Sequence, residues 1–178
     1  MPRPDLDIAG LERFHGHMCP GLAIGVRVAE IALREIGPHA EDEEVVAIVE
    51  TDMCAVDAIQ YFTGCTFGKG NLIHRDYGKS AYTFIRRSDG KAIRVTPKPE
   101  SRATLPDERA ARTEALLTRP ADALFNVVAV DIALPERARL YESVACAGCD
   151  ERVMETRLRR LGGALYCIPC FEARDRRV

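Results

Sequence analysis

Residues 15–38 read HGHMCPGLAIGVRVAEIALREIGP, and this stretch decides how the first part of the chain folds. The segment HGHMCPG is too rich in glycine and proline to be helical, but Pro20 suits the first position of a helix and Gly37-Pro38 suits its end. Between them, apolar residues recur every three or four positions, so the sequence predicts a helix over 20–36. Further apolar residues widen the stripe, which indicates burial on two sides or in a dimer.

The residues that follow this helix alternate between strand and helix patterns. A β-branched run at 45–49 is typical of a buried strand, and a helix over 54–62 follows it, with Asp52 as the expected N-cap residue. The other predicted elements are helices over 5–14 and 106–118, strands over 72–74, 81–87, 91–96 and 125–130, and a linker over 97–102. This order is neither all-α nor a regular βαβ series. We therefore expect an α+β fold, with a core of mixed helix and sheet.

Composition excludes several classes of protein. The chain has 178 residues, of which 47% are hydrophobic and 29% charged, as in a folded globular protein. Its net charge of −2 argues against a strongly basic nucleic-acid-binding protein. The N-terminus lacks the apolar core of a signal peptide, and charged residues interrupt the longest apolar stretch. We therefore expect a soluble cytoplasmic protein with no membrane association.

The seven cysteines favour metal or thiol chemistry over a disulfide framework, because their number is odd and four of them lie in the last 33 residues. Those four form two Cys-x2-Cys pairs with 17 residues between them, which is the spacing of a zinc site: Cys146, Cys149, Cys167 and Cys170. The alternative is a set of two redox dithiol pairs. We expect a core domain over 1–140 and a treble-clef-like finger with structural zinc over 141–178.

The charge of this finger indicates what it binds. From 146 to 178 the chain has seven arginines and five acidic residues, and four thiolates on Zn²⁺ make the finger nearly neutral. Nucleic-acid binding is therefore not expected from charge, although Arg157, Arg159 and Arg160 form a local basic group. Contact with a protein, packing in a dimer, or stabilisation of the fold are the favoured roles.

The other three cysteines lie in short loops of the first domain. Cys19 precedes one predicted helix and Cys54 opens another. The N–H groups at a helix N-terminus favour a thiolate, so both are candidate activated thiols. In an extended segment His15, His17 and Cys19 alternate onto one side, and His17 and Cys19 are expected to bind a metal with Cys54 as third ligand. The alternative is that Cys54 and Cys65 are buried small apolar residues and that the histidines bond loop backbone.

Three further residues near these loops have two interpretations each. Lys69 lies between two glycines and either contacts a phosphate or closes its loop, but the spacing of a P-loop is absent. Asp52 and Asp57 flank Cys54. They are either acceptors for the ring of His17 or, more simply, a helix cap and a solvated carboxylate.

Four motifs occur in a characteristic order: HGHMCPG at 15–21, ETDMCAVD at 50–57, GCTFGKGN at 64–71 and YGK at 77–79. Together they resemble the FmdE family, named after the E subunit of molybdenum or tungsten formylmethanofuran dehydrogenase. The resemblance covers about residues 10–140, and the finger looks like the zinc tail of many members. It implies an α+β core that forms an intertwined homodimer, with a metal-binding cleft at His17, Cys19 and Cys54.

Three functional hypotheses follow from these observations. The first is a dimeric metal-binding accessory protein with a second transition metal in the core, serving a molybdenum or tungsten oxidoreductase. The second is an enzyme with a cysteine thiolate or a Cys/His-bound metal, for which Cys54 and Cys65 are the candidate catalytic residues. The third is a regulator that binds nucleic acid through its finger. No pterin-binding or iron-sulfur motif is present, which argues against an oxidoreductase made of this chain alone.

Overall fold

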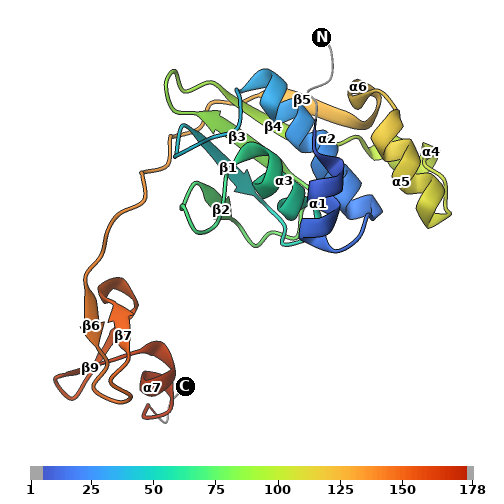
Figure 1. The fold of residues 1–178 in the computed structure, drawn as a ribbon. Coiled ribbons are helices and arrows are strands. Elements are labelled where there is room, and N and C mark those ends of the chain that lie inside the picture. The colour runs from blue at the N-terminus through green and yellow to red at the C-terminus, as the bar shows by residue number, and fades with distance from the viewer. Residues whose placement is uncertain (1–5, 176–178) are drawn as a thin grey trace. The chain divides into compact units, whose positions relative to one another are not determined.

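The computed structural model describes residues 6–175, and it divides after Ala138 into two compact units, the core unit and the finger unit. The elements of the core unit are α1 (Ile8–His15), α2 (Pro20–Glu35), β1 (Val45–Val49), α3 (Ala55–Thr63), β2 (Leu72–His74), β3 (Tyr82–Arg86), β4 (Ala92–Pro97), α4 (Pro99–Thr104), α5 (Arg109–Thr118), α6 (Ala121–Leu124) and β5 (Phe125–Ala129) (Figure 1). The α+β fold class is confirmed.

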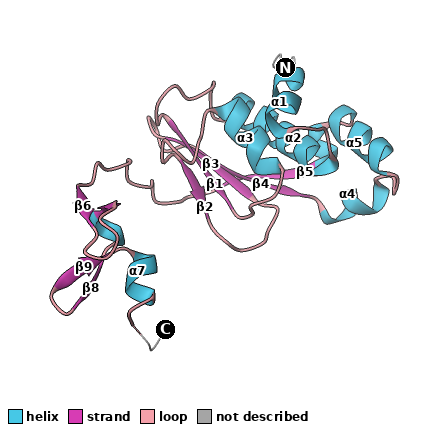
Figure 2. Cartoon of the chain, turned by 60° about the horizontal axis from the view of Figure 1, so that its bottom comes forward, coloured by secondary structure: helices cyan, strands magenta, loops and turns pink. Residues whose placement is uncertain are grey.

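The strands of the core unit form one sheet in the order β2-β1-β3-β4-β5. Strand β1 pairs with β2 in parallel, and all other neighbours are antiparallel. The hairpin predicted between β3 and β4 is present, with Tyr82 opposite Val95. Figure 2 shows the helices grouped on one side of this sheet.

Helix α2 confirms the element predicted over 20–36. The Cys19 sulfur accepts a hydrogen bond from the backbone N–H of Leu22, and Pro20 occupies the first turn, so both start signals are used. Residues such as Val28 and Ile31 face the sheet, whereas Leu22 and others pack against α1 and α3. Burial on two sides therefore explains the wide apolar stripe.

Strand β1 is buried along its whole length, because both faces of the sheet are covered there. Ala47 and Val49 belong to the core beneath α2 and α3. On the opposite face Val46 and Ile48 pack against the chain that follows β5, which includes Ile132. This double coverage explains why the run at 45–49 is continuously apolar rather than alternating.

Two predictions about the core are wrong. Residues 97–102 are not a linker: Pro97 ends β4 opposite Phe125 of β5, and the proline-initiated helix α4 follows. Because β5 returns to the same sheet as β4, the chain on both sides of this segment belongs to one unit. Asp52 is not the N-cap of α3 either; Cys54 occupies that position, and its side chain makes no capping bond.

The finger unit contains two small hairpins and a short helix. Its elements are β6 (Ser143–Ala145), β7 (Arg152–Met154), the 3₁₀ helix η1 (Glu155–Arg157), β8 (Arg159–Leu161), β9 (Ala164–Tyr166) and α7 (Ile168–Glu172). Strand β6 pairs with β7, and β8 with β9. Among the described residues of this unit only Cys146 and Cys167 are buried, so it has almost no apolar core.

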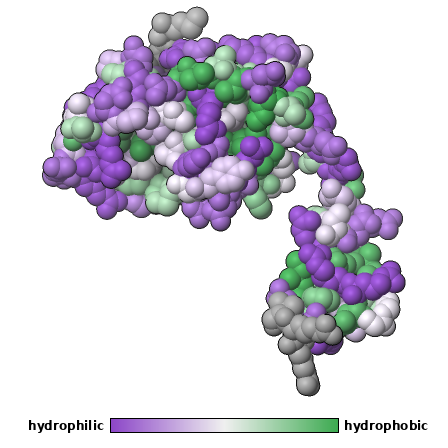
Figure 3. All heavy atoms as spheres, turned by 180° about the vertical axis from the view of Figure 1, so that it is seen from behind, coloured by the Kyte–Doolittle hydropathy of each residue, from purple (hydrophilic) through white to green (hydrophobic). Residues whose placement is uncertain are grey.

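The described surface is mixed in polarity, and on the face drawn in Figure 3 apolar residues lie between polar ones. Large exposed apolar side chains of the core unit include Phe14, Met53 and Val128. None of the described helices has the length and apolar character needed to cross a membrane.

Candidate metal centres

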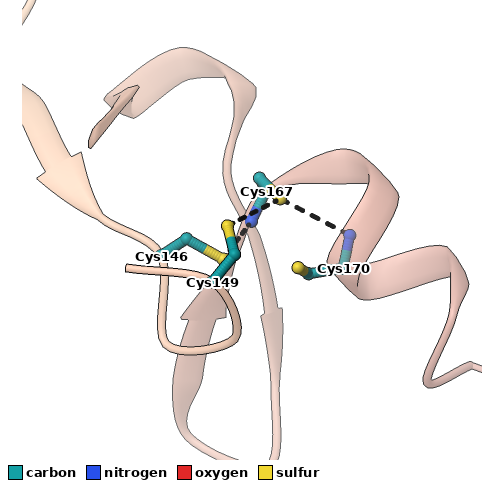
Figure 4. A group of neighbouring side chains, drawn as sticks. All are labelled: Cys146, Cys149, Cys167 and Cys170. Atoms are coloured by element: carbon teal, nitrogen blue, oxygen red, sulfur yellow. Dashed lines mark hydrogen bonds between the residues drawn. The ribbon is translucent and has the colours of Figure 1, made fainter. Parts of the chain in front are cut away.

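The four cysteines of the finger converge on one point. Cys146 and Cys149 lie in the turn between β6 and β7, and Cys167 and Cys170 lie at the start of α7 (Figure 4). All four sulfurs lie within 4.8 Å of one another, and those of Cys149 and Cys167 are 3.9 Å apart. Zinc–sulfur bonds of about 2.3 Å in a tetrahedron place sulfurs about 3.8 Å apart, so the set fits zinc.

Backbone N–H groups prepare the Cys146 sulfur for a metal. The Cys146 sulfur accepts hydrogen bonds from the N–H groups of Cys167 at 3.2 Å and Gly148 at 3.3 Å. These bonds, that of Cys167 first, lower the pKa of the Cys146 thiol to about 6. A thiolate at neutral pH is the form that binds zinc. Gly148 also leaves room, since a Cβ there would lie 3.0 Å from the Cys170 sulfur.

A second cluster lies where α1 passes into α2. His15 is the last residue of α1, His17 lies in the connecting loop, and Cys19 is the N-cap residue of α2. Gly16 ends α1 in the left-handed conformation, with φ of 96°, and the two imidazole rings lie 5.0 Å apart. One ligand atom from each of His15, His17 and Cys19 lies within 4.8 Å of the others.

His15 is oriented by a carboxylate from α3. Its Nδ1 lies 2.7 Å from Oδ2 of Asp57, and its side chain is 12% exposed. An ionised carboxylate only accepts hydrogen bonds, so Nδ1 of His15 carries a proton, and in the neutral ring Nε2 then carries the lone pair. Among the described residues Nε2 is buried and has no hydrogen-bond partner. Carboxylate–histidine pairs of this kind orient metal ligands, although the sequence suggested His17 as the partner of Asp57.

Cys54 lies beside this cluster rather than in it. It is not among the residues whose ligand atoms converge, but it packs in the same apolar group as Cys19. Burial and a hydrogen bond with Cys19 raise the pKa of the Cys54 thiol. Its position at a helix N-terminus predicts the opposite effect. Desolvation by burial is the largest cause of the higher pKa, and the Cys54 side chain makes no capping hydrogen bond at the start of α3.

Cys65 is fully buried, and its sulfur donates a hydrogen bond to the carbonyl oxygen of Val45 at 3.4 Å. Burial raises the pKa of this thiol to about 11. Its surroundings therefore disfavour the thiolate and give no support to a nucleophilic role.

Lys69 closes its own loop, because its Nζ donates to the carbonyl oxygens of Ala40 at 2.8 Å and Glu41 at 3.3 Å. Phosphate binding by Lys69 gains no support from these contacts.

Comparison with known protein families identifies the core. The family model described as "FmdE, Molybdenum formylmethanofuran dehydrogenase operon" matches residues 14–126, more than half of the chain. The chain belongs to the FmdE family. A second model, the prokaryotic dksA/traR C4-type zinc finger, matches residues 139–176, so this FmdE protein carries a four-cysteine zinc finger after its core, which supports structural zinc.

Two similar proteins place this FmdE chain among its relatives. A probable S-adenosyl-L-methionine-binding protein of Archaeoglobus fulgidus is 32% identical over an alignment of 193 positions, which covers 88% of the chain. The chain spans only 52% of that relative's length. The crystal structure of an FmdE-like protein of the tungsten formylmethanofuran dehydrogenase type, from Syntrophus aciditrophicus, has a TM-score of 0.71 at 23% identity, over 94% of this chain and 91% of its own. The FmdE fold is therefore confirmed.

His15, which lies in the FmdE motif at 15–21, is a candidate metal ligand. The set of ligands predicted from the sequence does not include it. Alternation alone places His15 on the side of His17 and Cys19, but the prediction preferred Cys54 as the third ligand. The missing signal was the contact of His15 with Asp57, which lies 42 positions away in the chain.

Proposed function

We propose that this chain is a metal-binding accessory protein of the FmdE type that holds a second transition metal in its core. The observation that carries the proposal is the convergence of His15, His17 and Cys19, with a buried, unpartnered Nε2 on His15 among the described residues. His15 takes the place that the sequence pattern gave to Cys54. Cys54 becomes a neighbouring thiol next to a ligand.

The donor set selects the class of metal. Two imidazoles and one thiolate suit zinc and other borderline or soft transition metals, and they do not suit magnesium or calcium. Three protein ligands leave one position free, as in sites that act on a substrate or pass a metal on. A metal held by these residues would supply a Lewis acid, and Asp57 would hold the His15 ring in the ligating tautomer.

Metal content tests this proposal directly. We expect purified protein to hold about two metal ions per chain, one in the finger and one in the core. His15→Ala and Cys19→Ser should each remove the core metal and leave the finger zinc, as measured by mass spectrometry of total metal. Cys54→Ser is the matched control and should keep both. If Cys54→Ser lost the core metal and His15→Ala kept it, the ligands would instead be the set predicted from the sequence: His17, Cys19 and Cys54.

A variant of Asp57 tests whether the orientation of His15 affects the affinity of the core site for metal. Asp57→Asn should keep the fold but weaken core metal binding by about 10- to 100-fold, because it removes the charge that orients His15. Competition with a chromophoric chelator measures the change. The exposed Asp52→Asn on the same segment serves as control. Equal affinities in the two variants would contradict the role of Asp57.

The proposed accessory role involves two kinds of partner, a molybdenum or tungsten oxidoreductase and a second copy of this chain. The family model is named after a molybdenum formylmethanofuran dehydrogenase operon, which supports service to a molybdenum or tungsten oxidoreductase. The proposal includes a cytoplasmic location for this role. A homodimer is supported by β5, which pairs only with β4 among the described strands and exposes Val127 and Val128. Light scattering should give a dimer, and Val128→Lys should weaken it. A monomeric wild type would end the dimer proposal.

Thiol catalysis is the less supported interpretation of the same residues. A nucleophilic cysteine needs a lowered pKa, whereas the pKa values of Cys54 and Cys65 are both raised by burial. If thiol chemistry were the function, iodoacetamide would modify Cys54 rapidly near neutral pH. We expect slow modification.

A further inference from the structure

A pocket of 480 Å³ lies in the core unit between α2, α4, α5 and the start of β5. Its walls are apolar and come from four elements or their ends: Ile24, Leu105, Leu116 and Phe125. Sites for small molecules usually measure about 300–1,000 Å³ and are lined mainly by apolar side chains. His15, His17 and Cys19 do not line this pocket, although Pro20, the residue after Cys19, does.

Every charged side chain that lines this pocket is cationic: Lys98, Arg102 and Arg112. Arg112 is held in place, since its Nε donates to the carbonyl oxygen of Pro106 at 2.8 Å. Its Nη2 lies 3.4 Å from a carboxylate oxygen of Asp107, whose side chain is fully exposed and well solvated. Such an exposed pair neutralises little charge.

The two other cations are not compensated. In the described part of the chain neither Lys98 nor Arg102 forms an ion pair, and no acidic residue lines the pocket. Lys98 is half-buried at the junction of β4 and α4, whereas Arg102 is exposed. Three cations around an apolar hollow attract an anion and repel a cation.

The hydroxyl groups of the pocket are already engaged within the protein. Oγ of Ser101 donates to the carbonyl oxygen of Lys98 at 2.7 Å, and the hydroxyl groups of Ser80 and Tyr82 lie 3.1 Å apart. The cationic side chains are therefore the groups best suited to recognise an anionic part of a ligand.

We infer that this pocket binds a small amphipathic anion, whose apolar part lies against Ile24, Leu105 and Leu116 and whose anionic head group meets Lys98 and Arg102. Carboxylate and phosphate head groups share this chemistry. The inference does not depend on the core metal, because no residue of the proposed metal site takes part.

Calorimetric titration of the full, zinc-containing chain tests the inference with three probes of equal chain length: decanoate, decyl phosphate and decylammonium, all below micelle-forming concentrations. We expect one saturable site for an anionic probe, and the tighter of the two anions identifies the head group. Decylammonium should not bind. Absence of saturable binding for both anions, or equal binding of decylammonium, would overturn the inference.

Variants distinguish this pocket from other surfaces. The double variant Lys98→Glu, Arg102→Glu should weaken anion binding by about tenfold or more, since it removes charged hydrogen-bond donors. Arg109→Glu on α5 is the matched control, because Arg109 is exposed and does not line the pocket. Ile24→Trp should fill the hollow and abolish binding. Wild-type affinity in the double variant would refute the assignment even if Ile24→Trp failed to fold.

Discussion

Glu50, the residue after β1, has a buried side chain that is nevertheless ionised at neutral pH. Its side chain is 6% exposed, and both carboxylate oxygens accept hydrogen bonds from Arg94 on β4, at 2.5 and 2.9 Å. The Arg94 hydrogen bonds are the largest cause that lowers the pKa of Glu50, and the charges of Lys79 and Arg75 add to it. The pair joins two strands of the sheet that are not neighbours in its order.

The stability of the core should therefore depend on pH through Glu50. Because folding lowers this pKa, the stabilisation is complete above the ordinary value of 4.5 and is lost as the pH falls through the lower folded value. Glu50→Gln should be less stable than wild type at pH 7, and the difference should shrink as the pH drops below 4.5. Urea unfolding at several pH values measures it, with the exposed Glu114→Gln as control. A difference independent of pH would contradict this role.

At the scale of elements, α2 and α3 pack so closely that a glycine is needed between them. A Cβ on Gly25 would lie 2.3 Å from the carbonyl oxygen and 2.7 Å from the Cα of Ala55. Backbone atoms of a packed helix cannot move away as a flexible side chain does. This contact positions the start of α3, which holds Cys54 and Asp57 beside the metal cluster.

Gly25→Ala should therefore destabilise the core by about 1–3 kcal/mol, as overpacking does, although alanine is the better helix former. Thermal or urea unfolding gives the change. Gly68→Ala is the matched control, because a Cβ there meets nothing within 4 Å. Equal stabilities of the two variants would show that α2 and α3 can separate without cost.

At the scale of the whole molecule, the two units rely on different sources of stability. The core unit buries a large apolar core, whereas in the described part of the finger unit only two cysteines are buried. A unit of about 40 residues without an apolar core needs a metal to fold.

Removal of zinc should therefore unfold the finger and leave the core folded. With a strong chelator, or in a Cys170→Ser variant, we expect loss of the finger's amide protection in hydrogen exchange, while the protection of β1 and α2 persists. Zinc added back should restore the finger in the chelated wild type only. Simultaneous loss of protection in both units would contradict separate stabilisation.

The sequence by itself determined most of the elements and the zinc finger. The helix at 20–36, the strand at 45–49 and the Cys-x2-Cys pairs all follow from spacings within a few residues, which local geometry converts directly into structure. Helix α4 escaped prediction because two prolines suggested a linker, whereas Pro99 in fact begins a helix.

The tertiary structure alone decided which chemical groups meet. Asp57 reaches His15 only because α3 packs against α1 and α2, and the pKa of the Cys65 thiol is raised because the core closes over it. The cationic pocket likewise depends on α5 packing against α2 and on β5 returning to the sheet. Such contacts join residues far apart in the chain, and they arise from packing of apolar faces rather than from any local spacing.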